Sequence, residues 1–531
     1  MRKTGVARAQ WSALATAVLL LIAPRSGAQE LDLGFLQTRA EATGYAETTG
    51  YDEAVAFLEV AAAQSDRLHI TTFGYTTEGR SLPLVVWGDV DPDPVSLRED
   101  TRLRIYLQGN IHAGEVCGKE AMLALVRDLA AGGYDAWLDD VVLLIAPIYN
   151  ADGNERVSLY NRPRQHGPVG GMGQRPNARN LDLNRDHMKL ASPEARSLVR
   201  MISAYDPHVL VDLHTTNGSR HGYHLTYAPP LNPNTHPAID GLLRDELLPA
   251  VTDAVREQHG WEFYHYGNLP FRNAPRGWYT FDHRPRFSNN YAGLRNRFGI
   301  LSEAYSYASF EDRVRASRAF VEAIVNYAAA NREAMMGALR EADDAVLPGS
   351  EYGVTATWKP TPEDVPILLG EVEQVRNPYS GAPMLLRTDE TRVEDMPAYI
   401  AFQAAETTVL PEAYLIPPGH DSVIALLKDH GVEVMAAPGG RALGEAFGID
   451  STRVAERAFQ GVNERTILGS WAPRSQETTQ EWTRVPLAQP LGRLVAYLLE
   501  PRSDDGIVNW DLIQFDGPEY PILRIPAGHR E

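Results

Sequence analysis

Residues 105–115, Ile-Tyr-Leu-Gln-Gly-Asn-Ile-His-Ala-Gly-Glu, constrain the fold of this chain more than any other stretch. A short apolar run ends in a Gly-Asn turn, then come His112 and Glu115, and an alanine- and leucine-rich helical pattern follows. We expect His112 to lie at the carboxyl end of a strand and Glu115 in the first helical turn, because side chains three residues apart share a helix face. The pattern predicts two metal-capable side chains close together.

A third candidate ligand follows later in the chain. The apolar run Val-Leu-Val-Asp-Leu ends at His214. Two histidines and one carboxylate, with one coordination position left to water, are a recurrent catalytic zinc set. An isolated His-x-x-Glu arises often by chance, so the prediction of one zinc ion per chain, bound by His112, Glu115 and His214, depends on the segments described below.

Helical and apolar segments alternate through the first two thirds of the chain. Ser192-Pro193-Glu194 is typical of a helix start, with a capping serine and proline at the first helical position. The alternation predicts an α/β fold, a mixed and mostly parallel central sheet with helices on both faces. Expected buried strands are 141–148, 209–213 and 298–301, and expected helices are 51–63, 118–131, 193–205, 237–257 and 311–338.

The pattern of apolar and proline residues changes at about residue 345. Proline-punctuated short runs predict a strand-rich domain with a short helix near 422–427. We find no metal or nucleophile constellation in it, so we interpret it as an accessory domain that packs or shapes the substrate site. The expected strands include 353–358, 398–402, 414–416, 433–436 and 494–499.

The first 28 residues resemble an export signal. Basic residues at 2, 3 and 8 precede an apolar segment at 11–23, and Ser26-Gly27-Ala28 is a small-residue cleavage site. The alternative is a membrane anchor, but the apolar segment is short for a span. We predict a signal peptide at 1–28, a catalytic domain at 29–340 and the accessory domain at 345–531, in a secreted or periplasmic protein without stable membrane insertion.

The net charge and the cysteine content limit the possible binding partners and the possible cross-links. A net charge of −19 disfavours nucleic acid as a partner, because phosphate binding requires a cationic face. The single cysteine, Cys117, excludes an internal disulfide, so the fold must be stabilised by burial. We expect Cys117 itself to be a small buried side chain.

Four further segments occur in an order that matches a known family. Asn150-Ala-Asp-Gly153 resembles an Asn-Pro-Asp-Gly turn, and Asn161-Arg-Pro-Arg164 lies where an arginine-rich segment is expected. Asp182-Leu-Asn-Arg185 and the His-Thr-Thr that begins at His214 complete the set. With the His-x-x-Glu pair, these segments resemble the zinc carboxypeptidase family, the carboxypeptidase A-like metallopeptidases, from about residue 50 to 330. The distance from the signal to the first helix is short, and in this respect the chain resembles a bacterial-type member without a large prodomain.

The resemblance implies a reaction and a general base. Hydrolysis of an amide needs a stronger nucleophile than free water, and a zinc ion lowers the pKa of its water towards about 7 and polarises the carbonyl. A nearby base must still take the proton and pass it to the leaving amine. The resemblance places this base at Glu303, after the apolar run 298–302.

Other roles are also implied by the resemblance. Asn184 and Arg185 would grip the terminal carboxylate of the substrate, since a guanidinium can hold it bidentately. Arg162 or Arg164 would stabilise the oxyanion of the intermediate. Tyr279 matches a mobile substrate-binding tyrosine, with Tyr291 as the alternative. The family often has arginine where this chain has Gly114, which leaves the substrate preference open.

We therefore predict an exported zinc metallopeptidase that hydrolyses C-terminal peptide bonds, acting on peptides with a free C-terminal carboxylate. The first alternative is a zinc-dependent amidase or deacylase acting on small acyl-amino acids or cell-wall peptides. The second is a non-catalytic protein that binds peptide or carbohydrate. Phe287 at the floor of the pocket would favour an apolar terminal side chain. His221 and His224 are a rival metal pair, in a segment that we interpret as a loop.

Overall fold

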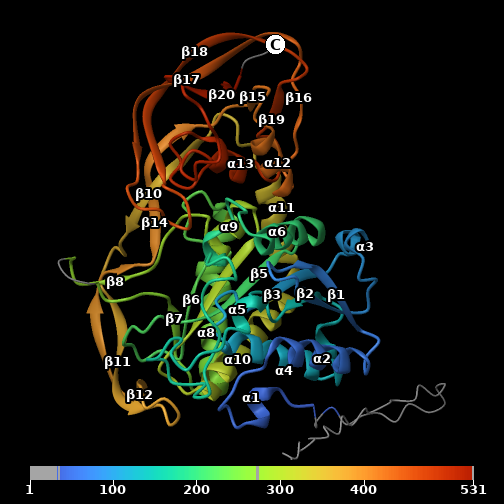
Figure 1. Cartoon of the computed structure of the whole chain (residues 1–531), viewed down its shortest axis with the longest axis vertical. Coiled ribbons are helices and arrows are strands. Elements are labelled where there is room, and N and C mark those ends of the chain that lie inside the picture. The colour runs from blue at the N-terminus through green and yellow to red at the C-terminus, as the bar shows by residue number, and fades with distance from the viewer. Residues whose placement is uncertain (1–32, 34–35, 271–273, 529–531) are drawn as a thin grey trace, which may run out of the picture. The chain divides into compact units, whose positions relative to one another are not determined.

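The apolar runs of the first two thirds of the chain form one central sheet. The computed structural model describes residues 33, 36–270 and 274–528, and within them this sheet has eight strands (Figure 1). The predicted signal peptide lies outside the described residues. In spatial order the strands are β1 (Leu68–Tyr75), β2 (Ser81–Trp87), β4 (Val141–Ala146), β3 (Leu103–Gly109), β5 (Val209–Thr215), β9 (Phe298–Ala304), β6 (Leu225–Ala228) and β7 (Phe263–His265).

The sheet is mixed, as predicted. Its centre is parallel, because β4, β3, β5 and β9 run in the same direction along successive neighbours. The strands β1 and β2 pair antiparallel at one side, and β6 pairs antiparallel with β9 at the other. The carboxyl ends of β3, β5 and β9 therefore lie at the same edge, where open α/β sheets bind ligands.

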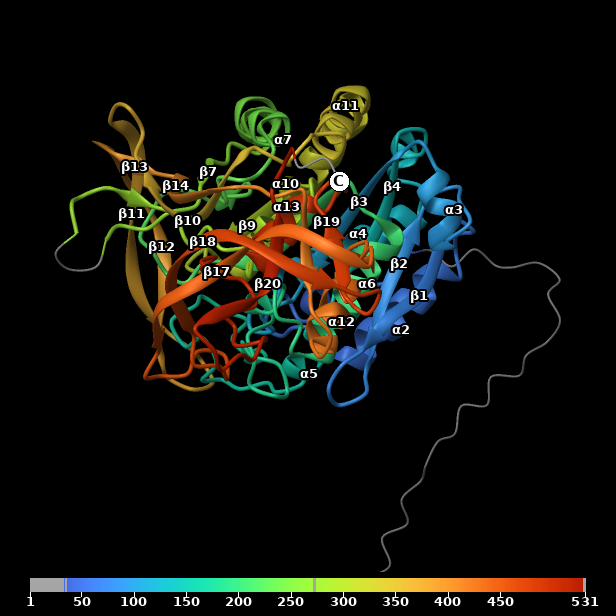
Figure 2. The ribbon, with the colours of Figure 1, turned by 90° about the horizontal axis from the view of Figure 1, so that it is seen from above.

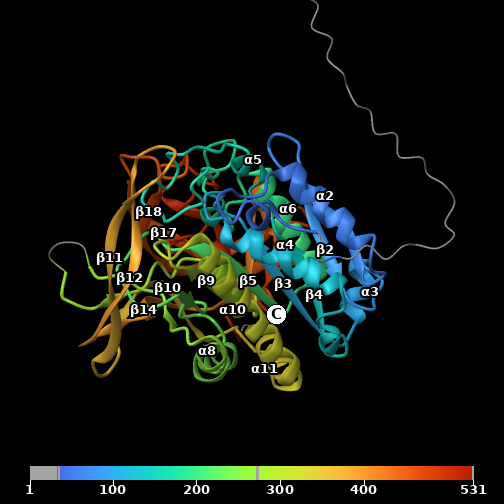
Figure 3. The same cartoon turned by 90° about the horizontal axis from the view of Figure 1, so that it is seen from below.

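Both faces of the sheet are buried under helices. Successive side chains of a strand point to opposite faces, so neighbouring residues belong to different hydrophobic clusters. Ile105 and Leu107 of β3 belong to one hydrophobic cluster, and Tyr106 belongs to the cluster on the other face. The first cluster includes residues of α2 (Tyr51–Ala62), α4 (Cys117–Ala130), α8 (Leu248–His259), α10 (Phe310–Ala330) and α11 (Arg332–Asp343) (Figure 3). The second includes residues of α3 (Pro94–Glu99), α6 (Pro193–Tyr205) and α9 (Ser288–Leu294).

Local sequence signals explain several boundaries. The Ser192 hydroxyl accepts a hydrogen bond from the Ala195 amide, so α6 begins at Pro193 as predicted. The predicted helix 237–257 consists of α7 (Pro237–Gly241), a π-helical segment η4 (Leu242–Leu247) and α8. Short elements between the main ones are α1 (Arg39–Ala42), η2 (Asp135–Trp137), α5 (Ala151–Asn154) and η3 (Leu183–Arg185).

Three predictions about local structure were wrong. Glu115 does not lie in the first helical turn, because its amide donates to the His112 carbonyl in a tight turn and α4 begins only at Cys117. The expected helix 311–338 is interrupted at Asn331, whose side chain caps α10 by donating to the Tyr327 carbonyl. The expected strand 494–499 is the helix α13 (Gly492–Leu499), which is buried on all sides, so its sequence carries no amphipathic period.

The segment after residue 345 is rich in strands, as predicted (Figure 2). Two antiparallel ribbons are β10 (Glu351–Lys359) with β14 (Ala401–Val409), and β11 (Val365–Arg376) with β12 (Pro383–Met396). A further sheet has the order β16 (Met435–Ala436), β19 (Thr483–Pro486), β15 (Ala413–Ile416), β20 (Glu519–Ile525), β17 (Gly440–Val454) and β18 (Arg465–Thr478). The predicted short helix is α12 (Asp421–Asp429).

The C-terminal strands pack onto the α/β part. One hydrophobic cluster contains Met188, Val199 and Tyr291 together with Tyr414 and Trp510. The short strand β13 (Ala398–Tyr399) also pairs with β8 (Trp278–Tyr279). Across the described residues, no helix combines the length and apolar character needed to cross a bilayer.

Candidate metal centre and substrate cavity

The three predicted metal ligands meet at the carboxyl edge of the central strands. The Glu115 Oε2 atom lies 2.9 Å from His214 Nδ1 and 3.2 Å from His112 Nδ1, and the two Nδ1 atoms are 3.2 Å apart. Ligand atoms about 2.0–2.1 Å from zinc at tetrahedral angles are separated by about 3.3 Å. All three side chains are buried, and their donor atoms fit one zinc-sized cation.

A carboxylate orients each histidine from the side away from the metal position. His112 Nε2 lies 3.0 Å from Asp182 Oδ1, and His214 Nε2 lies 2.9 Å from Asp212 Oδ2. A carboxylate accepts the Nε2 proton, which leaves the Nδ1 lone pair free for a metal. Burial opposes ionisation of Asp182, but His112 lowers the pKa of this carboxyl well below its usual value. The donor set is therefore arranged as in a zinc site.

Arg162 holds the second oxygen of Glu115. Its Nη1 donates to Glu115 Oε1 at 2.7 Å, and its Nη2 donates to the carbonyls of Thr215 and Thr216. A Cβ atom at Gly114 would lie only 2.9 Å from Arg162 Cδ, so the glycine provides the space for this side chain. Arg162 holds a candidate metal ligand and does not line the cavity described below.

Arg164 and the predicted tyrosines lie elsewhere. The Arg164 side chain is exposed, and its carbonyl accepts a hydrogen bond from the Leu385 amide. The Tyr279 ring stacks on Tyr399 with 4.1 Å between centroids, and its hydroxyl donates to the Pro275 carbonyl. Tyr291 is fully buried beside His430. The fold does not bring these side chains to the metal ligands.

His221 and His224 also lie apart from the metal ligands. The His221 ring is fully buried against Tyr305, with 4.2 Å between ring centroids. His224 Nδ1 accepts a hydrogen bond from the Glu262 amide, and its ring stacks on Trp261. Residues 221–224 form a loop, as predicted, and both rings pack against aromatic side chains.

A cavity of about 180 Å³ opens beside the metal ligands. It contains the predicted residues Asn184, Arg185 and Glu303, so these side chains assemble around the same space as the ligands. Its remaining lining residues are Arg175, Thr215, Asn217, Tyr266, Phe281, Asp282, Phe287 and Leu301.

Arg185 has a free cationic edge in this cavity. Its guanidinium stacks on the Phe287 ring at 3.9 Å, and its Nη1 donates to the Asn184 carbonyl. Among the described residues, no carboxylate oxygen lies within 4.0 Å of this guanidinium, since Asp186 pairs with Lys189 and Asp182 with Arg175. Burial lowers the pKa of Arg185 to about 10, so it stays charged at neutral pH.

Glu303 faces the metal ligands from the neighbouring strand. It lies within β9, one residue before its end, and is in register with His214 of β5. Its Oε2 atom is buried without a hydrogen-bond partner among the described residues. Burial, with a smaller contribution from Glu115, raises the pKa of Glu303 to about 8. A carboxyl group with this pKa can both accept and return a proton near neutral pH.

Arg175 and Tyr266 are two of the lining residues that were not predicted. Arg175 Nε donates to Asp182 Oδ2 at 2.9 Å, and its Nη1 lies 3.6 Å from Glu115 Oε1. The sequence offered one indication of this role, the position of Arg175 seven residues before Asp182. The oxyanion role was instead assigned to the arginines of segment 161–164. Tyr266 follows β7 with no motif around it. Burial raises the pKa of its hydroxyl, so the hydroxyl is protonated and can donate.

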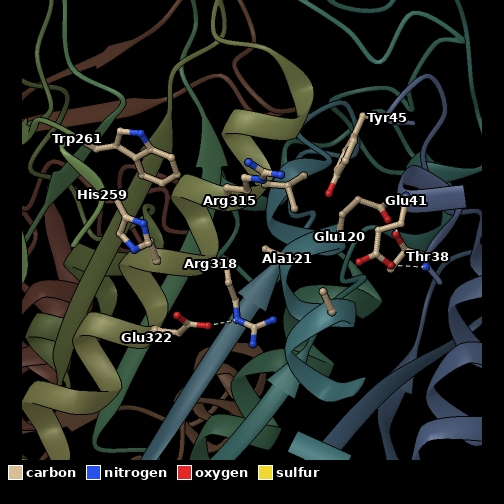
Figure 4. A pocket seen from close by; sticks show the side chains of 13 residues that line it. Thr38, Glu41, Tyr45, Glu120, Ala121, His259, Trp261, Arg315, Arg318 and Glu322 are labelled. Carbon is tan, nitrogen blue, oxygen red and sulfur yellow. Dashed lines mark hydrogen bonds and ion pairs between the residues drawn. The ribbon is translucent and has the colours of Figure 1, made fainter. Parts of the chain in front are cut away.

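A larger cavity, of about 400 Å³, lies among α1, α4, α10 and the end of α8 (Figure 4). Its charged groups largely pair with one another or with neighbours, since Arg318 bonds Glu322 and Glu41 bonds Arg127. Trp261 and His259 stack on each other at its rim. None of the metal ligands lines it, so the chemistry of this protein is centred on the smaller cavity.

Comparisons with known proteins agree with this geometry. Residues 55–227 match the family model described as zinc carboxypeptidase. Carboxypeptidase 2 of Trichophyton tonsurans is 24% identical over 478 residues, covering 84% of this chain and 81% of the relative. Probable carboxypeptidase 2 of Trichophyton verrucosum is 33% identical over 147 residues, covering 27% of this chain and 25% of the relative. Among solved structures, a metallo-carboxypeptidase from Burkholderia cenocepacia covers 52% of this chain and 68% of its own, with 19% identity and a TM-score of 0.40.

The His-Glu-His centre, the family-model match and the curated carboxypeptidase relatives define the class of protein as a zinc metallocarboxypeptidase, a hydrolase. The family is that of the zinc carboxypeptidases, to which the domain matched at residues 55–227 belongs. The resemblance found in the sequence is thereby confirmed.

Proposed function

We propose that this protein is an exported exopeptidase that removes the C-terminal residue from peptides, with one zinc ion per chain held by His112, Glu115 and His214. The observation that carries the proposal is the position of the free Arg185 guanidinium in the same cavity as Glu303. A terminal carboxylate bound by Arg185 places the last peptide bond beside the metal ligands. The cavity volume of about 180 Å³ suits a single amino-acid residue.

Each lining residue has a role in this proposal. Arg185 donates two hydrogen bonds to the terminal carboxylate, and the side-chain amide of Asn184 supplies a further donor. Arg175, whose guanidinium faces Glu115, is our choice for the cation that stabilises the oxyanion, because Arg162 is committed to Glu115 and Arg164 is exposed. The protonated Tyr266 hydroxyl can donate to the substrate backbone.

Proton transfer is assigned to Glu303. A zinc ion in this site supplies Lewis acidity, which makes a water molecule more acidic and the scissile carbonyl more electrophilic. Glu303 accepts the proton of the attacking water and delivers it to the leaving amine. Its unpartnered Oε2 atom and its raised pKa support this role, because the carboxylate is not engaged by another donor.

The cavity favours an apolar terminal side chain. Phe281, Phe287 and Leu301 supply apolar lining. Asp282 is the acidic lining residue nearest to them in sequence, and Arg284 neutralises it through hydrogen bonds from Nε. We therefore expect terminal phenylalanine or leucine to be removed faster than terminal lysine or arginine.

A substrate panel with two variants tests the proposal. Blocked dipeptides with a free carboxylate should be cleaved, and the same dipeptides as C-terminal amides should be cleaved at least about 100-fold more slowly. Glu303→Gln should keep zinc and lose about 10²–10⁴-fold in kcat, and Arg185→Met should mainly raise KM. Equal cleavage of the amides would exclude the carboxylate grip. Faster hydrolysis of acyl-amino acids than of dipeptides would favour an amidase.

Export is a separate proposal with its own test. The protein secreted from cells that express the full sequence should begin at Gln29, which N-terminal sequencing would establish. Retention of residues 1–28 in a membrane fraction would contradict it and favour the anchor.

A further inference from the structure

The strip Arg286–Phe287–Ser288 connects the substrate cavity to the metal centre. The Phe287 ring lines the cavity and stacks on Arg185. The Ser288 amide donates to Asn184 Oδ1 at 2.9 Å, and the Ser288 hydroxyl donates to Asp212 Oδ2 at 2.6 Å. The position of this strip therefore sets the carboxylate-binding pair and the carboxylate that orients His214.

The C-terminal segment holds this strip from outside the α/β part. The Arg286 amide donates to Asp505 Oδ2 at 2.6 Å, and Arg286 Nε donates to Asp505 Oδ1 at 2.8 Å. Arg286 Nη2 donates to Glu464 Oε1 at 2.9 Å and to Asn509 Oδ1 at 3.2 Å. The guanidinium also lies 4.3 Å from the centroid of the Trp510 ring. Four C-terminal side chains thus enclose one arginine.

Burial makes this contact demanding. Arg286 is 1% exposed and Asp505 is fully buried, and the Trp510 indole donates to Asp505 Oδ1 at 2.7 Å. Removing one partner from a buried ion pair leaves the other charge uncompensated, which costs far more than the loss of an exposed pair. The backbone at residue 286 is fixed directly, because Asp505 binds its amide as well as its side chain.

A second contact from the C-terminal segment reaches Asp182, the carboxylate that orients His112. The loop 455–464 joins β17 to β18, and its residue Gln460 accepts a hydrogen bond from the Asp182 amide at 2.8 Å. Asp182 orients His112 and binds Arg175. The C-terminal segment therefore touches both carboxylates that orient the histidines, Asp182 directly and Asp212 through Arg286 and Ser288.

We propose that the C-terminal segment 455–510 is a working part of the substrate site, with Asp505 as a positioning residue that acts through Arg286 on the carboxylate grip. Gln460 is a second positioning residue, which acts through Asp182. Neither side chain lines the cavity. This inference rests on the proposed function, because the affected step is recognition of a substrate carboxylate.

The expected effect is on binding more than on chemistry. When Arg286 loses its carboxylate, the strip relaxes, and Phe287 and Asn184 no longer hold Arg185 in one orientation. Small misplacements of positioning groups cost up to about 100-fold. Glu303 lies on β9, and Asp212 keeps its own contact with His214 within β5, so proton transfer is retained once the substrate is bound.

The experiment compares Asp505→Asn with a matched control. Glu519→Gln removes one negative charge from an exposed ion pair that joins β20 to Arg474 of β18. The readouts are zinc content, melting temperature, kcat and KM for a blocked dipeptide ending in phenylalanine, and calorimetric binding of N-acetyl-phenylalanine. We expect Asp505→Asn to keep zinc, to raise KM and the dissociation constant at least 10-fold, and to change kcat less than 3-fold. Glu519→Gln should stay within 2-fold of the wild type.

Several outcomes would overturn the inference. Unchanged KM and ligand binding in Asp505→Asn would do so, and so would a fall in kcat with KM unchanged. If Asp505→Asn does not fold, Gln460→Ala decides, since it removes one partly exposed acceptor. For this variant, a fall of at least 3-fold in zinc affinity or kcat with an unchanged melting temperature supports the inference, because Asp182 contacts His112 and Arg175. Wild-type zinc affinity and kinetics contradict it. If the wild-type protein binds N-acetyl-phenylalanine without cleaving peptides, the proposed function alone is wrong. If it neither binds this ligand nor cleaves peptides, the proposed function and the inference are both wrong.

Discussion

The carboxylate behind His214 offers a quantitative test of the metal centre. Asp212 accepts from His214 Nε2 at 2.9 Å, from Gln108 Nε2 at 3.1 Å and from the Ser288 hydroxyl at 2.6 Å. The substitution Asp212→Asn keeps the shape of the side chain but replaces one acceptor oxygen by an NH₂ group. Either His214 or Gln108 then faces a donor, because the Gln108 oxygen is already bound by Tyr106.

The magnitude follows from the role of this carboxylate. It fixes the tautomer of His214 and increases the basicity of Nδ1, and loss of such a partner typically lowers metal affinity by about 10–100-fold. This corresponds to about 1.4–2.8 kcal/mol. The substitution should therefore weaken zinc binding within this range while the protein remains folded.

The assay is competition for zinc between the protein and a chelating dye at pH 7.5. Asp253→Asn serves as the control, because Asp253 is exposed on α8 and pairs with Arg256 of the same helix. Equal zinc affinity of Asp212→Asn and the wild type would refute the reasoning that Asp212 prepares His214 for a metal. A loss of affinity in the control as well would show that net charge alone is responsible.

Three further predictions concern protons and packing. Zinc binding at pH 7 should release about one to two protons, since His214 and Glu303 both have raised pKa values in the metal-free protein. Calorimetry in buffers of different ionisation enthalpy measures the number of protons released. Binding heats that do not depend on the buffer would contradict this prediction. The folded pKa of Glu303, about 8, lies above its unfolded value, so the metal-free protein should lose stability as pH rises through about 8, and Glu303→Gln should flatten this dependence in thermal melts. Gly118→Ala should destabilise the fold by about 1–3 kcal/mol, because its Cβ would lie 2.6 Å from Leu213 Cβ, whereas Gly337→Ala on α11 has open space and should be neutral or stabilising in the same melts.

The sequence predicted what depends on short-range patterns. The strands around Leu107, Leu144 and Val211 read as apolar runs because both faces of the sheet are covered. The candidate ligands His112, Glu115 and His214 could be selected from the sequence because each one follows or ends such a run, and the structure brings their donor atoms together. The strip at Phe287 was correctly expected to shape the pocket.

The remaining features depend on contacts between distant segments. The resemblance offered Arg162 or Arg164 for the oxyanion, but three acceptors on Glu115, Thr215 and Thr216 bind the Arg162 side chain. Arg175 enters the cavity because Asp182 holds it there, which no local pattern indicates. The helix α13 was taken for a strand because tertiary burial on every side removes its period.

The enclosure of Arg286 by Asp505, Glu464 and Asn509 also governs when a newly made chain acquires its site. The pocket wall is translated more than two hundred residues before its main anchor, so a nascent or truncated chain has the zinc ligands without a finished substrate pocket. Recombination that exchanges the C-terminal strands among relatives must carry these anchors with it. We therefore expect a chain that ends before these strands to bind substrate poorly.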